Sequence, residues 1–382
     1  MVVRMTSDFQ HQTLAQHVSF STGAGPRDLA AAVTRAGATR AFLIVSGSSA
    51  EWADAATARL PIAYRFGEIL AHVPADLADR ARIAAAKVDA DLLIAVGGGS
   101  AIGLAKAVTL TNGLPIVAVP TTYAGSEVTP VWGLTDNGVK RTGTDSCVLP
   151  VEVVYDTELT ARLPARLSVE SALNGLAHCI DGLWAPGANP VNTALGTDAI
   201  RMLADGLRAI DGDKVQPAAR RDLLLGAYLA GSAFASAGSG MHHKVCHVLG
   251  GAFGLPHAAL HAAVLPYILA FNAPSAPAAA ERVARSLGTA DALEGMANLY
   301  DRTSSHRALR DLGLSREDIA IVADRVLAAI PASNPRPVDI ATVRHLLTAA
   351  WWGAPWREVS GSDFSQWNPA PLVRHATPHN HS

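Results

Sequence analysis

Hydrophobic and polar positions follow different patterns in the two halves of the chain. Short apolar runs bounded by turn residues occur at 40–46, 91–96 and 115–120, which is typical of strands buried in a parallel sheet. Further short strands are predicted at 18–20 and 62–66. Helical periodicity separates the strands, at 27–36, 50–58, 74–88 and 101–110. This alternation predicts a doubly wound parallel sheet in an α/β domain.

After Pro164 the pattern is helical almost throughout. The turn signal Asp136-Asn137-Gly138-Val139 precedes this change and predicts a hairpin. Helices are predicted at 168–184, 192–211, 217–237, 241–250, 257–270, 277–287, 291–312 and 316–329. We therefore expect an α/β domain at 1–163, an all-α domain at 164–356 and a poorly ordered polar tail at 357–382.

Composition narrows the range of partners. The 382 residues suffice for two domains, and 49% hydrophobic residues allow sizeable cores. With 31 basic and 33 acidic residues, the net charge of -2 gives no support for a nucleic-acid or membrane partner. Three cysteines cannot form a disulfide framework, and no stretch reaches the roughly 18 apolar residues of a membrane span. We expect a cytoplasmic protein.

A glycine loop joins a predicted strand to a predicted helix. Gly97-Gly98-Gly99-Ser100 would let a diphosphate approach the backbone and the N–H groups at the helix N-terminus. The match to the dinucleotide fingerprint is imperfect because the next glycine, Gly103, comes one position late. The alternative is a tight turn that needs glycine for packing.

Two other loops would lie beside this one. Thr121 and Thr122 follow the next strand, and Ser46 follows the strand at 40–46, so all three are candidate cofactor-binding residues beyond the carboxyl ends of the strands. An ordinary polar loop is the alternative at Thr121 and Thr122. Because no acidic residue follows Ser46 closely enough to repel a 2′-phosphate, we expect NADPH to be accepted beside NADH.

Polar residues at metal-ligand spacing mark the predicted helical part. Asn174 and His178 are four residues apart, as are His243 and His247, so each pair shares one helix face. With His257, these residues could converge in a cleft. The spacing leaves open whether they meet a metal, a substrate or water.

These motifs together resemble the iron-containing (group III) alcohol dehydrogenase superfamily, over roughly residues 15–350. One branch, the maleylacetate reductases, is matched most fully. The features typical of that branch are Gly103, the run Thr121-Thr122-Tyr123-Ala124-Gly125-Ser126-Glu127, Trp132-Gly133-Leu134-Thr135, Val139-Lys140-Arg141-Thr142-Gly143 and His242-His243-Lys244-Val245-Cys246-His247.

The resemblance implies a Rossmann-like domain, an all-helical domain, an active site in the cleft between them, and a homodimer. Metal-dependent relatives hold their ion with an Asp and three His, which match Asn174, His178, His243 and His257. Asn174 replaces the only anionic ligand, although three histidines alone can hold zinc. The branch generally does without metal, so we expect no metal ion here.

The resemblance also implies a reaction, the NAD(P)H-dependent reduction of the C=C bond of maleylacetate, or a chlorinated analogue, to 3-oxoadipate in the degradation of aromatic compounds. His247 is the candidate general acid. His178, His243 and His257 would form a polar, protonatable cluster around the dicarboxylate substrate, together with Asn174. Candidate clamps for its carboxylates are Lys244, Lys140 and Arg141.

Two other functions compete with this one. The first is a metal-dependent alcohol dehydrogenase that tolerates Asn174. The second is a non-catalytic dinucleotide-binding protein, against which the retained histidines argue. Two further histidines are left out of the site, because His242 would point about 100° away from His243 and His261 is expected on a helix face.

Overall fold

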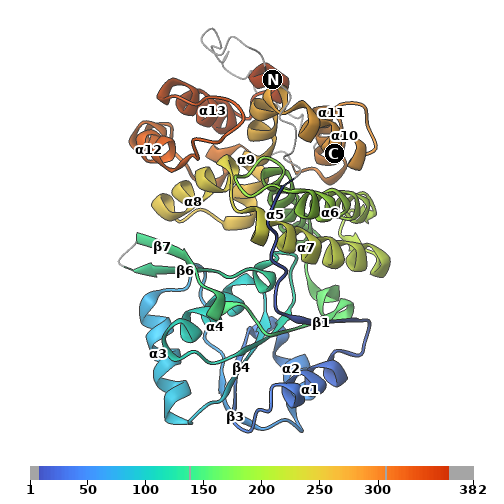
Figure 1. Cartoon of the computed structure of the whole chain (residues 1–382), viewed down its shortest axis with the longest axis vertical. Helices are drawn as coiled ribbons and strands as arrows, with labels where there is room; N and C mark the ends of the chain where they lie inside the picture. Colours follow the sequence, from blue (N-terminus) through green and yellow to red (C-terminus); the bar gives the residue numbers. More distant parts are fainter. Residues whose placement is uncertain (1–7, 137–138, 306–307, 361–382) are drawn as a thin grey trace, which may run out of the picture.

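The computed structural model describes residues 8–136, 139–305 and 308–360. A parallel six-stranded sheet in the order β1-β8-β5-β4-β2-β3 forms the lower half of the molecule in Figure 1. Its strands are β1 His17–Ser21, β2 Ala41–Val45, β3 Ile62–Phe66, β4 Leu92–Gly97, β5 Ile116–Pro120 and β8 Glu152–Asp156. The predicted parallel sheet is confirmed.

The central strands are buried because helices cover both faces of the sheet. These helices are α1 Gly25–Arg35, α2 Ala50–Thr57, α3 Ala75–Lys87 and α4 Gly99–Asn112. Every residue of β2, β4, β5 and β8 is buried. One apolar core joins the sheet to α3 and α4, and a second joins the other face to α1 and α2. This double burial explains why β2, β4 and β5 are apolar rather than alternating.

The second half of the molecule is helical (Figure 1). Its helices are α5 Ala165–Gly182, α6 Pro190–Arg208, α7 Pro217–Ala237, α8 Met241–Phe253, α9 His257–Asn272, α10 Pro277–Ser286, α11 Ala292–Thr303, α12 Arg316–Ala329, α13 Ile340–Trp352 and α14 Trp356–Ser360. α5 is the central helix and packs against α6, α7 and α9. The fold is thus α/β followed by a mostly helical half, as predicted apart from one short ribbon at 210–215. The division at 163/164 stays a prediction and lies just before α5.

Short antiparallel ribbons complete the structure. β6 Val131–Asp136 pairs with β7 Val139–Thr144, and β9 Ile210–Asp211 pairs with β10 Lys214–Val215. The first ribbon projects from the α/β half beneath α8 in Figure 1. The turn residues 137 and 138 that predicted this hairpin lie outside the described residues.

Several elements differ from the prediction. The helix expected at 291–312 ends at Thr303, because Ser304 takes a left-handed conformation (φ 49°), and a 3-10 turn follows at Leu309–Leu312. Helices α13 and α14 and strand β8 were not predicted. The expected tail begins within α14, and residues 361–382 lie outside the described part.

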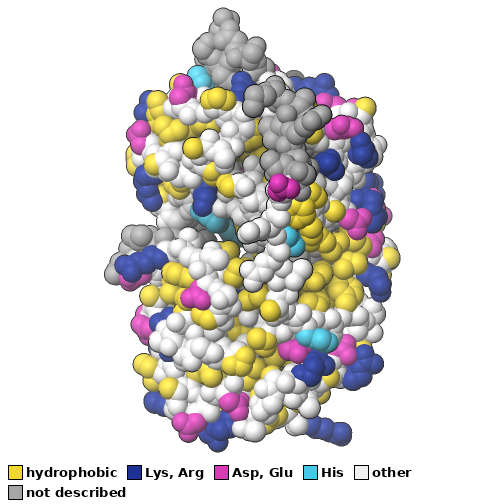
Figure 2. Space-filling view, viewed as in Figure 1, with side chains coloured by type: hydrophobic (Ala, Val, Ile, Leu, Met, Phe, Trp, Pro, Cys, Tyr) yellow, Lys and Arg dark blue, Asp and Glu magenta, His cyan; other side chains and the backbone are white. Residues whose placement is uncertain are grey.

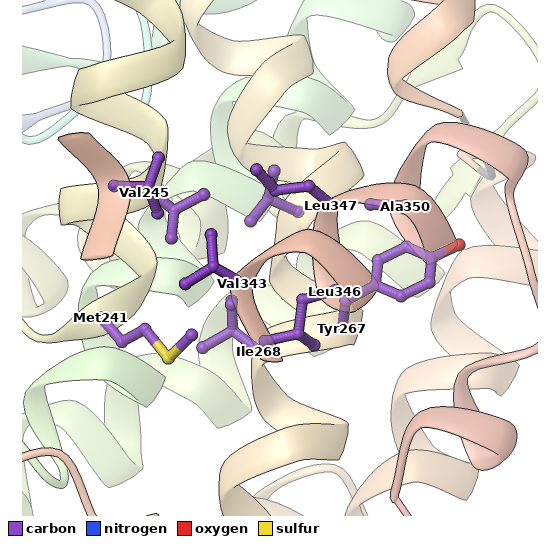
Figure 3. A pocket seen from close by; sticks show the side chains of 10 residues that line it. Met241, Val245, Tyr267, Ile268, Val343, Leu346, Leu347 and Ala350 are labelled. Atoms are coloured by element: carbon purple, nitrogen blue, oxygen red, sulfur yellow. The ribbon is translucent and has the colours of Figure 1, made fainter. Parts of the chain in front are cut away.

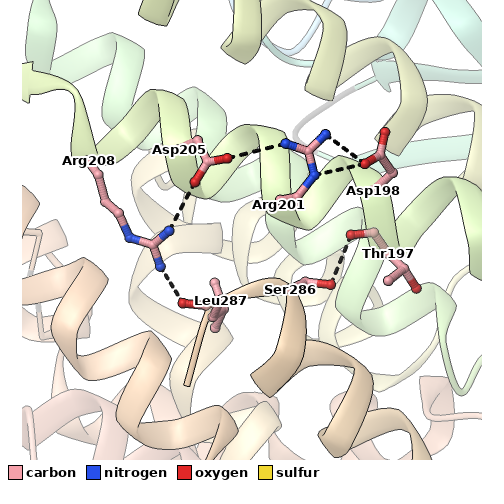
Figure 4. Close-up of polar contacts among 7 residues, drawn as sticks. All are labelled: Thr197, Asp198, Arg201, Asp205, Arg208, Ser286 and Leu287. Atoms are coloured by element: carbon pink, nitrogen blue, oxygen red, sulfur yellow. Dashed lines mark hydrogen bonds and ion pairs between the residues drawn. The ribbon is translucent and has the colours of Figure 1, made fainter. Parts of the chain in front are cut away.

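Polar contacts support the helical packing from its surface (Figure 4). Along α6, Arg201 pairs with Asp198 at 2.8 Å, and Arg208 pairs with Asp205 at 3.2 Å. Arg208 also donates to the Leu287 carbonyl at 2.5 Å. Exposed ion pairs at helical spacing contribute only about 0.3–0.5 kcal/mol each, so apolar burial dominates the stability of this half.

A small cavity lies among residues of helices α8, α9, α12 and α13 (Figure 3). Its volume is about 10 Å³, close to the least that a water needs. The lining is apolar, with Val245, Ile268 and Leu347 among its residues. A water there would have too few polar partners, so we interpret it as a packing gap rather than a binding site.

One helical stretch has the length and average hydropathy of a membrane span. His257–Ser275 passes this test by length and composition alone, although His257, His261 and Asn272 interrupt its apolar sequence. However, 78% of it is buried inside the protein, as in the core helix of a globular domain.

Candidate active site

The three loops predicted to bind the cofactor lie side by side at the carboxyl ends of the parallel strands. The Ser46 N–H donates to the Val96 carbonyl at 3.1 Å, and the Thr121 N–H donates to the Gly97 carbonyl at 3.1 Å. α4 starts directly after this edge, at Gly99. The loop residues predicted to bind cofactor are therefore neighbours at the N-terminus of a 14-residue helix, where backbone N–H groups can bind a phosphate.

The glycines of this loop differ in their surroundings. A Cβ on Gly98 would lie 2.9 Å from Cγ2 of Thr122, so glycine at this position is needed for packing. A Cβ on Gly99 would meet nothing nearer than Ala124 Cβ at 3.8 Å. The packing alternative therefore explains Gly98 but not Gly99.

A buried lysine that the sequence analysis missed anchors the next loop. Lys106 of α4 donates from Nζ to the carbonyls of Ser126 (2.6 Å), Thr129 (2.7 Å) and Val131 (2.8 Å). Burial lowers the pKa of Lys106 to about 7, against the opposing effect of buried Glu127. The lysine thereby fixes the chain that follows Thr121 and Thr122.

One face of α5 carries the centre of the site. Asn174, His178 and Asp181 follow one another at helical spacing and are all buried. The Asp181 carboxylate lies at the N-terminus of α8, where it accepts from the backbone N–H groups of Gly240 (2.8 Å), His242 (3.1 Å) and His243 (3.2 Å). This contact joins the two helices that bear the predicted histidines, and a carboxylate is favourable at a helix N-terminus.

His243 lies between Asp181 and His178. Its Nδ1 is 2.8 Å from Asp181 Oδ2, and its ring stacks on that of His178 with centroids 5.0 Å apart. Phe234 of α7 packs against both rings, at 4.4 and 4.7 Å. The described residues offer no hydrogen-bond partner to three buried atoms here, Asn174 Oδ1, His178 Nδ1 and His243 Nε2. Buried polar atoms normally have partners, so these three indicate a place for a ligand.

The other predicted histidines join this cluster through ring contacts. The His247 ring lies 6.1 Å from that of His243, and His257 lies 4.3 Å from His261, which in turn lies 5.0 Å from His243. Histidine side chains are visible in the hollow between the two halves of the molecule (Figure 2). The structure thus brings His178, His243, His247 and His257 together.

Burial opposes protonation of two of these histidines, which were expected to belong to a protonatable cluster. Burial lowers the pKa of His178 to about 4. Burial, together with the charges that His178, His247 and Lys244 would carry, also lowers the pKa of His243 well below its usual range. Both side chains are therefore neutral near pH 7, and each keeps a nitrogen lone pair.

The three cations predicted to bind the substrate carboxylates lie in different surroundings. Lys244 is half-buried on α8 next to His243. Arg141 is 69% exposed on β7 and forms an ion pair with Asp136 at 3.3 Å, so its side chain lies on the surface of the hairpin. Lys140 pairs with Thr135 through the backbone, but its side chain lies outside the described residues.

Several residues of the cluster were not predicted from the sequence. His261, expected on a helix face, is fully buried, and its Nδ1 lies 3.0 Å from Nε2 of His242. Cys246 Sγ lies 3.7 Å from the same His242 nitrogen. Three-residue spacing from His178 would have pointed to Asp181, and four-residue spacing from His257 to His261. No comparable signal pointed to Phe234.

Comparison with known proteins identifies the family. Residues 16–157 match the model of the iron-containing alcohol dehydrogenases, and residues 168–351 match that of the C-terminal domain of the same family. A maleylacetate reductase of Burkholderia cepacia is 46% identical over 282 residues, which cover 74% of this chain and 80% of that protein. The chain belongs to the iron-containing alcohol dehydrogenase family.

Other members of this family agree along most of the chain. A maleylacetate reductase of Sphingobium indicum is 46% identical over 76% of this chain and 82% of its own length. Among solved structures, an iron-containing alcohol dehydrogenase of Corynebacterium glutamicum has a TM-score of 0.90 at 47% identity, covering 93% of this chain and all of that one. The maleylacetate reductase of Agrobacterium tumefaciens has a TM-score of 0.85 at 34% identity, covering 91% and 99%. The predicted branch is confirmed.

The expected absence of metal is contradicted. Membership of an iron-containing family implies a bound metal, and the ligand atoms of His242, Cys246 and His261 lie within 4.8 Å of one another, as in a group that could hold an ion. The donors at the centre of the site fit a metal too. Asn174 Oδ1, His178 Nδ1 and His243 Nε2 are buried without partners in the described part of the chain, and neutral imidazole and carbonyl groups are metal ligands.

Proposed function

We propose that the chain reduces the C=C bond of maleylacetate, or of a chlorinated analogue, with NADH or NADPH, giving 3-oxoadipate. The observation that carries this proposal is the 46% identity to maleylacetate reductases over three quarters of the chain. The substrate has a ketone conjugated to the C=C bond and a carboxylate at each end. The enzyme therefore has to place a hydride donor, a proton donor and cations around it.

In the proposed reaction, hydride from the nicotinamide bonds to the carbon β to the ketone. The electrons of the C=C bond move toward the ketone oxygen and form an enolate, and a proton then adds at the α carbon. We assign the dinucleotide to Gly97-Gly98-Gly99-Ser100, Thr121, Thr122 and Ser46, with its diphosphate at the start of α4. The shared edge of these loops supports the assignment.

We assign the proton donor to His247, which is half-buried one turn beyond His243. Asn174, His178, His243 and His257 would hold the metal, and a bound divalent ion would supply Lewis-acid polarisation of the ketone. Lys244, Lys140 and Arg141 would bind the carboxylates. Arg141 would have to leave Asp136 to do so, which makes it the weakest of these assignments.

The test is NADH oxidation with maleylacetate, with propanol and NAD run alongside. The proposal predicts turnover of maleylacetate and none of propanol. Each reaction would be repeated after exhaustive chelation and after zinc or iron is added back, which measures the contribution of the metal. Turnover of propanol alone would contradict the proposal.

A metal-dependent alcohol dehydrogenase is the second candidate. It would use the same unpartnered buried donors, Asn174 Oδ1, His178 Nδ1 and His243 Nε2 among the described residues, and it is distinguished from the reductase by its substrate. It predicts propanol oxidation that disappears on chelation and returns with metal. Tight NADH binding with no turnover of either substrate would instead support a non-catalytic dinucleotide-binding protein.

The substrate is a small molecule, as in the reductase relatives. We further propose a cytoplasmic homodimer that binds neither nucleic acid nor membrane, in keeping with the net charge of -2. Light scattering of the purified chain tests the dimer. A monomer at working concentrations would contradict it.

A further inference from the structure

Asp181 caps the N-terminus of α8 and also contacts the imidazole ring of His243. Its two oxygens accept from five N–H groups, on the backbone of Gly240, His242 and His243, on the His243 ring and on the Trp184 indole. Backbone and indole N–H groups can only donate, so the carboxylate is an acceptor throughout. Capping explains the three backbone bonds. It does not explain the contact to the imidazole.

The imidazole contact determines where the His243 proton lies. In a neutral histidine one ring nitrogen carries a hydrogen and the other carries a lone pair that can accept a hydrogen bond or bind a metal. With Oδ2 of Asp181 at 2.8 Å, the hydrogen is on Nδ1, which leaves the lone pair on Nε2. That Nε2 atom is buried and has no partner among the described residues.

We propose that Asp181 is a positioning residue that fixes His243 in the tautomer with a bare Nε2, ready to bind a divalent metal ion. The ring is also held sterically, because Phe234 and His178 pack against it at 4.4 and 5.0 Å. Carboxylates that orient a ligating histidine in this way also raise its basicity. The inference deepens the proposed function, and rests on it only for the ion that His243 would bind.

The backbone around Asp181 is shaped for this contact. A Cβ on Gly240 would lie 2.5 Å from Asp181 Oδ1, so only glycine lets the start of α8 approach the carboxylate so closely. Asp181 itself is fully buried on α5, three residues beyond His178. One buried carboxylate therefore links a candidate ligand on α5 to another on α8.

Two variants separate positioning from capping. Asp181→Ala removes every acceptor. Asp181→Asn keeps one oxygen, which should take the Oδ2 position, because three donors converge there and only two at Oδ1. The Asn variant should therefore retain the tautomer, and the Ala variant should lose it. Asp339→Ala is the matched control, since Asp339 caps α13 by accepting from the Thr342 N–H and contacts neither His178 nor His243.

The experiment measures the full-length protein in two ways. Nitrogen NMR on protein labelled at histidine, with His243 assigned from a His243→Gln sample, should show hydrogen on Nδ1 in wild type and Asp181→Asn but not in Asp181→Ala. Zinc titration of chelated protein should show affinity about 10–100-fold weaker in Asp181→Ala. Asp339→Ala should lower the melting temperature without changing either readout.

Each contrary result bears on a separate claim. Hydrogen on Nε2 in wild type, or an Asp181→Ala variant that melts earlier with unchanged tautomer and zinc affinity, would reduce Asp181 to a helix cap and overturn the inference. Wild-type protein that binds no zinc would overturn its metal part. Failure of maleylacetate turnover with the tautomer as expected would count against the proposed function alone.

Discussion

At the scale of single residues, the centre of the site consists of buried neutral side chains next to one buried carboxylate. His178 and His243 are held neutral by burial, and Asp181 is held as an acceptor by its donors. Asn174 is buried, with Oδ1 unpartnered among the described residues, and is neutral by its chemistry. The candidate ligand set therefore carries no negative charge of its own, and metal affinity should depend on this position.

Restoring a carboxylate at this position should strengthen metal binding. Asn174→Asp is expected to tighten zinc binding, since a carboxylate ligand compensates part of the charge of a divalent ion and an amide does not. Zinc affinity is measured by competition with a chelator. Asn112→Asp adds the same charge on the exposed end of α4 and serves as control. Equal affinities for the two variants would exclude Asn174 from the metal site.

Loss of the proposed proton donor should slow the reaction without weakening cofactor binding. His247→Gln is expected to reduce kcat for maleylacetate by about 10²–10⁴-fold, the usual contribution of a general acid. The NADH dissociation constant, measured by fluorescence, should stay unchanged because the loops at the sheet edge are untouched. His345→Gln, on α13, is the control. A kcat close to wild type would move the proton donor elsewhere.

At the scale of elements, α4 serves both the cofactor loop and the loop after β5. Its first residue, Gly99, lies at the carboxyl ends of the parallel strands. Two turns later, Lys106 donates hydrogen bonds to the carbonyls of Ser126, Thr129 and Val131. A single helix thus fixes both loops relative to the strands. Substitution of Gly99 should affect cofactor binding, and substitution of Lys106 should affect the stability of the fold.

Gly99→Ala distinguishes a cofactor loop from a packing turn. The added methyl group has room in the protein, so the fold should keep its stability or gain up to about 1 kcal/mol, as for alanine in place of helical glycine. The same methyl group would obstruct a diphosphate, and the NADH dissociation constant should rise at least about tenfold. Gly67→Ala, which also adds its methyl group in open space, should leave NADH binding unchanged. Unchanged NADH binding in Gly99→Ala would support the packing turn.

Lys106 should give the stability a specific pH dependence. Its pKa is about 7 in the folded chain and near 10.4 when unfolded, so the unfolded chain binds the extra proton between these values. The contribution of Lys106 to the free energy of unfolding therefore rises with pH across that window, by up to about 1.4 kcal/mol per unit. Urea unfolding of wild type and Lys106→Met at pH 7.5 and 9.5 measures it. A wild-type-minus-variant difference that does not grow with pH would contradict the assignment.

At the scale of the whole molecule, the sequence predicted the α/β half more completely than the helical half. β2, β4 and β5 are apolar at every position because both faces are covered, and such runs are unmistakable. β8 was missed because its pattern, Glu152–Asp156, contains charged ends that bind Arg35 and the backbone at Gly23 and Gly25. Tertiary contacts, invisible in a local pattern, decided that strand.

The candidate site shows the same limit. Helical spacing predicted which histidines could meet, and ring contacts bring them together. The lowered pKa values of His178 and His243 depend on burial, to which Phe234 and neighbouring helices contribute and which spacing does not reveal. For the same reason His261 was expected on a helix face although it is fully buried.

The burial of α5 has a consequence for how this family can diversify. Asn174, His178 and Asp181 all belong to one 18-residue helix that is enclosed by α6, α7 and α9. Aspartate and asparagine side chains have the same size and shape, so an exchange between them at position 174 requires no change in the packing of α5. An aspartate and an asparagine at this position can therefore be carried by the same helix in the same packing.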